Sequence, residues 1–126
     1  MAQVFELQPR ERIVIDTARL DALCRRLGQN ATEVFVIERV EQITDRLAEI
    51  DWQNRSDLIS EVQLLARQVA VIAGEIGLVS LARVAADLAA SAGAGDRAAY
   101  RAVWERLVRI GDESLANVWE TPSLQM

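Results

Sequence analysis

The sequence predicts an all-α domain, folded as an up-and-down antiparallel four-helix bundle with a short additional N-terminal helix. The two prolines, Pro9 and Pro122, lie near the ends of the 126-residue chain, so no proline interrupts its interior. Hydrophobic residues make up 51% of the chain and aromatic residues only 5%, a balance of small aliphatic side chains that suits packed helices. Between the turns, apolar residues recur at alternating spacings of four and three, which is the spacing of one helix face.

The first helix is predicted over residues 17–27. Asp16 is its expected N-cap, because a carboxylate there accepts a hydrogen bond from a free N–H of the first turn. Gly28 ends the helix. Residues 12–15, with the sequence Arg-Ile-Val-Ile, read as a short extended lead-in.

The second helix is predicted over residues 32–50, with Asn30 or Thr32 as its cap and residues 51–55 as the turn that follows. Its apolar stripe consists of Val36, Val40, Ile43, Leu47 and Ile50. The third helix is predicted over residues 56–75. Its stripe consists of Leu58, Val62, Leu65, Val69, Ile72 and Ile76.

The fourth helix is predicted over residues 78–92, and the small residues 91–95 form the turn after it. Its inward positions are Leu78, Leu81, Ala85, Leu88 and Ala92. Asp96 is expected to cap a fifth helix over residues 97–119, which Gly111 bends or interrupts. The inward positions of that helix are Tyr100, Val103, Leu107 and Ile110. Short loops between long helices favour antiparallel neighbours.

The chain length fits one domain with a single core. We place that domain at residues 13–120, between an N-terminal tail, residues 1–12, and a C-terminal tail, residues 121–126. No apolar run approaches the length that spans a bilayer, and the first residues lack the pattern of a secretory signal. With a single cysteine and no such signal, we expect a cytoplasmic protein.

The chain contains no histidine and no lysine, and all 14 of its basic residues are arginine. Without histidine it lacks the side chain that most often transfers protons near neutral pH or binds metals. Without lysine it lacks the side-chain amine that forms Schiff bases. The net charge of −5 argues against nucleic-acid binding, which needs a positive face. We expect no enzymatic activity, no metal, no cofactor, no nucleic acid and no membrane among its functions.

One outward strip of the third helix carries the candidate site. Arg67 lies two residues from both Leu65 and Val69, so at 100° per residue it points away from the core stripe. The residues on the same outward strip are Ser60, Leu64, Val71 and Gly74. An arginine between apolar residues on a solvent-exposed helix face is typical of a small docking patch. The other interpretation is that this helix packs against neighbours on several sides and that Arg67 is an ordinary solvated charge.

The third helix, the turn at Gly77 and the fourth helix resemble a histidine-containing phosphotransfer (HPt) domain. The matching residues are Ile76-Gly77-Leu78 at the turn and Leu81-Ala82 in the next helix. The opening helix and the closing helix also resemble their counterparts, so that the resemblance covers roughly residues 13–119. In that family an exposed histidine opens a His-x-Leu-Lys-Gly pattern.

The departures from that pattern decide what the resemblance implies. Arg67 stands where the family keeps its phosphate-accepting histidine, Ala70 stands at the lysine and Val71 at the glycine. The resemblance therefore implies a degenerate member that binds its partners without carrying phosphate. The implied partner is a response-regulator receiver domain or a histidine kinase. A receiver domain presents an acidic pocket ringed by apolar residues, which a planar guanidinium suits.

The alternative is a structural module outside two-component signalling. In that interpretation Leu64 and Val71 are buried between two copies of the chain in a homodimer. Size measurement over a concentration series distinguishes the two readings.

Other groups are better explained without a site. The acidic residues of the second helix favour a solvated, partly ion-paired face over a metal or acid–base centre; they are Glu33, Glu38, Glu41, Asp45 and Glu49. Cys24 is expected to be a small buried hydrophobe, since no histidine is present to activate it. Four arginines on the last helix form either a solvated face or a strip that steers an acidic partner; they are Arg97, Arg101, Arg106 and Arg109. Trp119 either closes the helices or contacts a partner.

Overall fold

The structure is a computed structural model that describes residues 12–56 and 59–125. Its described residues contain five α-helices and no β-strand. The helices are α1 (Thr17–Leu27), α2 (Gln29–Arg55), α3 (Val62–Glu75), α4 (Val79–Ala94) and α5 (Arg97–Asn117). Three short 3-10 helices complete the chain, η1 (Ile59–Glu61), η2 (Val118–Glu120) and η3 (Pro122–Leu124). The all-α prediction is confirmed.

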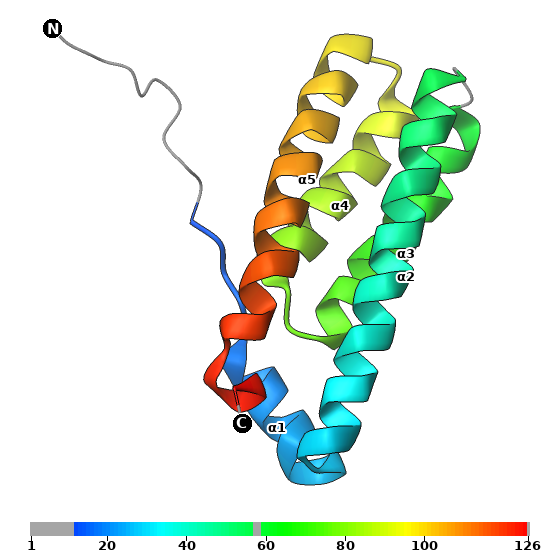
Figure 1. The fold of residues 1–126 in the computed structure, drawn as a ribbon. Helices are drawn as coiled ribbons and strands as arrows, with labels where there is room; N and C mark the ends of the chain where they lie inside the picture. Colours follow the sequence, from blue (N-terminus) through cyan, green and yellow to red (C-terminus); the bar gives the residue numbers. More distant parts are fainter. Residues whose placement is uncertain (1–11, 57–58, 126) are drawn as a thin grey trace, which may run out of the picture.

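The four long helices lie lengthwise beside one another, and α1 lies at the end of the molecule that also holds the C-terminal segment (Figure 1). α3 contacts α2 and α4, and α4 contacts α5. α3 is therefore packed on two sides, which leaves its remaining face as a ridge between α2 and α4.

Most of the core consists of residues that the spacing of four and three selects, but five predicted stripe residues are only partly buried; they are Val40, Leu47, Leu65, Ala92 and Val103. All five α-helices contribute buried side chains, among them Leu20, Val36, Ile43, Val69, Leu81, Leu88, Leu107 and Ile110. Burying one such aliphatic side chain stabilises a fold by about 1.5–3 kcal/mol, so this shared interior is what holds the helices together.

The start of the described chain is tied to the turn between α3 and α4. Asp16 accepts a hydrogen bond from the N–H of Arg19, as its predicted role as N-cap of α1 requires. Its own N–H donates to the carbonyl of Gly77 at 2.7 Å, and Ile15 forms an isolated bridge with Leu78. Gly77 has φ +78°, a left-handed conformation that favours glycine. The extended lead-in thus acts as a clasp across that turn.

The predicted boundaries of the second helix are wrong at both ends. α2 begins at Gln29, directly after Gly28 at φ +88°, and no side chain caps it. Thr32 is fully buried inside the helix, so neither it nor Asn30 serves as the cap. At the other end, residues 51–55 continue the helix to Arg55 instead of forming a turn. α2 therefore has 27 residues and is about 40 Å long.

The later helices differ from prediction in smaller ways. η1 precedes α3, which begins at Val62 instead of residue 56, while the predicted core position Leu58 lies outside the described residues. Asp96 caps α5, accepting from the N–H of Ala99. α5 runs through Gly111 without interruption, and this buried glycine faces side chains of α2 and α4. A Cβ there would lie 3.5 Å from a methyl of Leu47 and 3.7 Å from one of Leu81.

The C-terminal segment is folded onto α1, although residues 121–126 were expected to form a tail. Thr121 and Leu124 are buried, and η3 contacts both α1 and α2. The carbonyl of Ser123 lies 3.6 Å from the Cys24 Sγ, and the Ser123 hydroxyl donates to Asp21. Trp119 is packed against the core. Apart from Arg12, the expected N-terminal tail lies outside the described residues.

Candidate docking surface on α3

The five residues singled out from the sequence are all exposed; four lie on the outward side of α3, whereas Ser60 lies in η1, before α3 begins. We call them the α3 surface: Ser60, Leu64, Arg67, Val71 and Gly74. Leu64 is 56% exposed and Val71 is 63% exposed, the two largest exposures among the large hydrophobic residues that the structure describes. A Cβ built on Gly74 meets nothing within 4 Å, so the helix backbone itself is accessible there. The fold leaves this surface uncovered.

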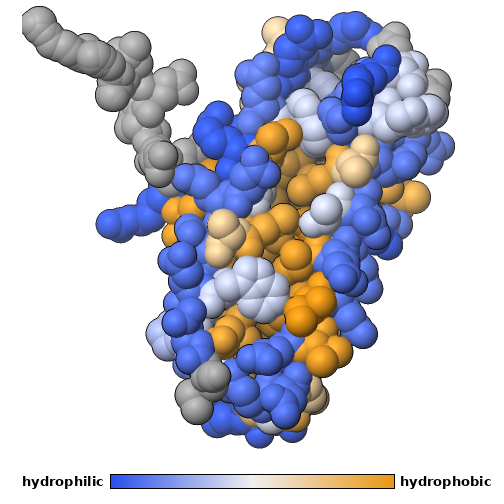
Figure 2. Space-filling model, viewed as in Figure 1, coloured by the Kyte–Doolittle hydropathy of each residue, from blue (hydrophilic) through white to orange (hydrophobic). Residues whose placement is uncertain are grey.

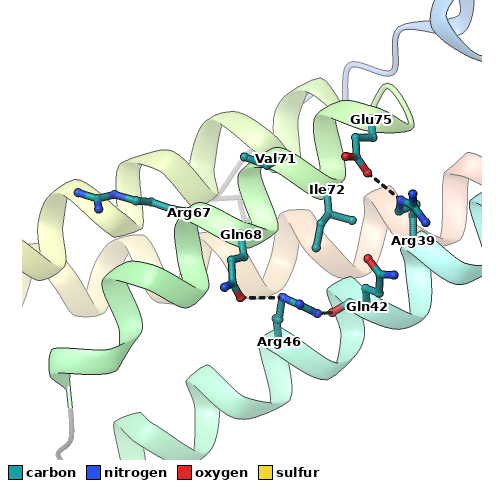
Figure 3. Close-up of a pocket in the computed structure, with 8 residues that line it drawn as sticks. All are labelled: Arg39, Gln42, Arg46, Arg67, Gln68, Val71, Ile72 and Glu75. Atoms are coloured by element: carbon teal, nitrogen blue, oxygen red, sulfur yellow. Dashed lines mark hydrogen bonds and ion pairs between the residues drawn. The ribbon is translucent and has the colours of Figure 1, made fainter.

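Arg67 is the charged residue in the middle of this surface. It is exposed, and it makes no hydrogen bond or ion pair with the described residues. In Figure 3 its side chain extends away from the labelled residues of α2. Its guanidinium therefore keeps all its N–H donors for solvent or for a partner.

Arg67 and Val71 form a crest between two shallow grooves. The groove toward α4 has a volume of about 460 Å³ and small walls, which consist of Gln63, Ala70, Ala86, Ala89 and Ala90 besides the two crest residues. The groove toward α2, about 430 Å³ in volume, is lined by Arg39, Gln42, Arg46, Gln68, Ile72 and Glu75 together with the same two residues. We call this second depression the α2–α3 groove.

Two arginines of α2 line the α2–α3 groove in different electrostatic states. Arg39 donates from Nε to a Glu75 carboxylate oxygen at 2.7 Å, and its guanidinium lies 4.1 Å from the centre of the Phe35 ring. Arg46 donates from Nε to the Gln68 side-chain oxygen at 2.9 Å, a neutral acceptor. The charge of Arg39 is thus balanced within the protein by a carboxylate, whereas that of Arg46 is held by amides (Figure 3).

A second apolar hollow lies between α2 and α5. Figure 2 shows apolar side chains gathered along the middle of the molecule between these helices. One part of it, about 300 Å³ in volume, is lined by Leu47, Ala48, Asp51, Trp104, Val108 and Asp112. Nothing in this hollow resembles the arginine-centred arrangement on α3.

The remaining sequence candidates form no site. Within the described part of the chain, no group of three or more acidic or cysteine side chains is placed to hold a metal ion. The five acidic residues singled out on the second helix are exposed or half-buried. On α5, Arg106 pairs with Asp87 of α4 at 3.5 Å, so this part of the basic strip is used within the fold. No helix in the described residues is long and apolar enough to cross a membrane.

Comparison with known proteins adds no assignment. No protein-family model matches the chain, and no curated protein or solved structure is significantly similar to it.

Sequence reasoning missed the α2 half of the groove. Arg39, Gln42 and Arg46 follow one another at spacings of three and four, which places them on one face of α2. The same spacing is also typical of a solvated face. Only the register of α2 against α3, which sets Arg46 opposite Gln68 and Arg39 opposite Glu75, separates the two interpretations.

Proposed function

We propose that this chain is a non-catalytic signalling module that binds a response-regulator receiver domain or a histidine kinase without carrying phosphate. In this proposal the helices form an up-and-down antiparallel four-helix bundle, with α1 packed across one end, as in the HPt domains that the sequence resembles. The protein acts in the cytoplasm by holding or sequestering its partner.

The observation that carries the proposal is the exposed arginine between two exposed apolar side chains. The family resemblance puts the phosphate-accepting histidine at residue 67, and residue 67 lies in the open on the crest of α3. The same resemblance requires a glycine at the turn after α3, and Gly77 has the positive φ that such a turn needs. The absence of histidine from the 126 residues leaves no imidazole in them to carry phosphate.

The physical basis of binding is that each part of the α3 surface suits an acidic pocket with an apolar rim. Arg67 supplies a planar guanidinium for bidentate hydrogen bonds to carboxylates. Leu64 and Val71, one turn away on either side, supply apolar area that is already exposed to water and is removed from it on docking. Gly74 lets a partner approach the helix backbone closely.

The test is calorimetric titration of purified receiver domains into the wild-type protein and into Arg67→Glu. Reversing a charge that faces carboxylates replaces an attraction by a repulsion, so we expect the affinity to fall by at least about 100-fold. Arg101→Glu, an exposed charge reversal on α5, is the matched control and should leave the affinity within about twofold. Equal affinities of the wild type and Arg67→Glu would remove residue 67 from the interface.

The second candidate function is a homodimer that buries the same apolar residues. The exposure of Leu64 and Val71 favours it, because both are large side chains that the monomer leaves in water. Sedimentation over a concentration series decides between the two. A tight dimer that Val71→Glu dissociates supports the structural module, whereas a monomer at every concentration supports docking of a different protein.

A further inference from the structure

Arg46 is a guanidinium held in place without a carboxylate. Its Nε donates to the Gln68 side-chain oxygen at 2.9 Å, and its Nη1 donates to the backbone carbonyl of Gln42 at 3.3 Å. Both acceptors are neutral, and no carboxylate of the described residues pairs with this side chain. These two bonds fix the plane of the group and use two of its five N–H donors, which leaves the edge formed by Nη1 and Nη2 available.

A side-chain amide and two apolar side chains lie beside the available edge of the Arg46 guanidinium. Gln42 is one turn before Arg46 on the same face of α2, and its side-chain amide makes no hydrogen bond with the described residues. Val71 and Ile72 line the same groove. An oriented guanidinium, an amide donor and an apolar wall form a site that complements a planar anion attached to an apolar stem, which is the chemistry of an aspartate or glutamate side chain.

The two arginines of α2 that line the groove differ in whether a carboxylate of the protein balances their charge. Arg39 is balanced by Glu75, and Glu75 itself would repel an incoming carboxylate at that end. Arg46 and Arg67 have no such counter-charge among the described residues, although the chain as a whole carries a net charge of −5. Arg46 lies in the groove against Gln68, whereas the Arg67 side chain extends from α3 away from the α2 residues, so the two uncompensated charges lie apart on either side of Gln68 (Figure 3).

We propose that Arg46, with the Gln42 amide, binds the carboxylate of an aspartate or glutamate side chain of the partner protein that covers the α3 surface. The inference rests on the proposed function and extends it to α2. The partner then presents at least two acidic side chains, one for Arg67 and one for Arg46, with an apolar group between them that contacts Val71. This surface thus recognises a pair of carboxylates and not a single one.

The first experiment measures partner affinity by calorimetry for the wild type, Arg46→Gln and the matched control Arg101→Gln. The glutamine keeps a polar side chain at residue 46 but loses the charge and the fork of donors. We expect Arg46→Gln to weaken binding about 10-fold or more and Arg101→Gln to leave it unchanged. Equal affinities of Arg46→Gln and Arg101→Gln, with Arg67→Glu still impaired, would overturn the Arg46 site and leave the proposed function standing.

The second experiment needs no partner. Glutarate, a free dicarboxylate, is titrated into ¹⁵N-labelled protein at constant ionic strength, and the signals of the Arg46 Nε–H and the Gln42 and Gln68 side-chain amides are followed. We expect saturable shifts of these signals that Arg46→Gln abolishes and Arg101→Gln preserves. Shifts no larger than those that chloride causes would overturn the carboxylate site. If no receiver domain binds but the glutarate response is specific, the proposed partner is wrong and the carboxylate site stands.

Discussion

Gly77→Ala is expected to be among the most damaging single-methyl additions to this protein. Gly77 is buried in the turn between α3 and α4 and has φ +78°. A Cβ built there lies 2.7 Å from the backbone carbonyl oxygen of Asp16, closer than such atoms approach in real structures. That carbonyl cannot swing away freely, because the N–H of the same residue donates to the Gly77 carbonyl and the Asp16 side chain caps α1.

The magnitude follows from two separable costs. A left-handed backbone costs an alanine about 1–2 kcal/mol relative to glycine. Relieving the contact with Asp16 requires the clasp between the lead-in and the turn to shift, and forced overpacking of this kind costs about 1–3 kcal/mol more. We therefore expect Gly77→Ala to lower the free energy of unfolding by about 2–5 kcal/mol, a large part of the stability of a small domain.

Gly95→Ala isolates the first of these costs. Gly95 also has a positive φ, +83°, but a Cβ there meets nothing within 4 Å. Gly74→Ala completes the series, because Gly74 lies in a helix, in open space and at an ordinary φ, so alanine should stabilise the protein by about 0.5–1 kcal/mol. The three variants add the same methyl group and differ only in backbone conformation and in what the methyl meets.

The assay is urea unfolding followed by the circular dichroism of the helices, with the slope of the transition compared between variants. If Gly77→Ala and Gly95→Ala lose the same stability, the close approach of Asp16 imposes no constraint and the clasp is not a part of what holds the fold. If Gly74→Ala destabilises the protein, the α3 surface is covered in solution.

Two further predictions concern the interior. Burial raises the pKa of Tyr100, the only tyrosine of the chain, above its usual value of 10.0, against the opposing effect of its hydrogen bond to Asn54. Between the unfolded and folded pKa the unfolded state releases this proton first, so the free energy of unfolding should fall as the pH rises above 10. The difference between wild type and Tyr100→Phe isolates that fall, and absorbance titration of tyrosinate gives the folded pKa directly; a pKa at or below 10 contradicts the burial. Leu124→Ala should lower the free energy of unfolding by about 2–4 kcal/mol in the same urea assay, because Leu124 is buried where η3 meets α1, and a loss below about 0.5 kcal/mol would show that the C-terminal segment leaves α1 in solution.

The parts of the fold that follow from local rules could be predicted from the sequence. α1 begins and ends where Asp16 and Gly28 indicate, and the apolar stripes supply the core. The start of α2 could not be predicted from capping preferences, because Gly28 at φ +88° lets one helix end and the next begin without a loop. Thr32 then falls on the buried side of α2, where its hydroxyl finds no partner among the described residues, the opposite of what a cap requires.

The candidate site was predictable only as far as one helix determines it. The position of Arg67 on the outward side of α3 follows from the 100° turn per residue, and the structure places it there. The C-terminal segment and the α2 half of the groove depend on which elements meet, and no spacing within a single helix contains that information. Leu124 is separated from its contacts on α1 by about a hundred residues, so its burial is a property of the tertiary structure.

Val71 shows why the α3 surface calls for an explanation beyond folding. The run Val69-Ala70-Val71-Ile72-Ala73 is almost continuously apolar, which taken alone predicts a helix buried on all sides. In the structure Val69, Ile72 and Ala73 are indeed buried and Ala70 is half-buried, but Val71 is 63% exposed. The fold thus gains little from the side chain at residue 71, and a polar residue there would cost it almost nothing. The docking proposed for α3 accounts for an apolar residue at that point, one turn from an arginine that pairs with no carboxylate of the described residues, whereas packing within the fold does not.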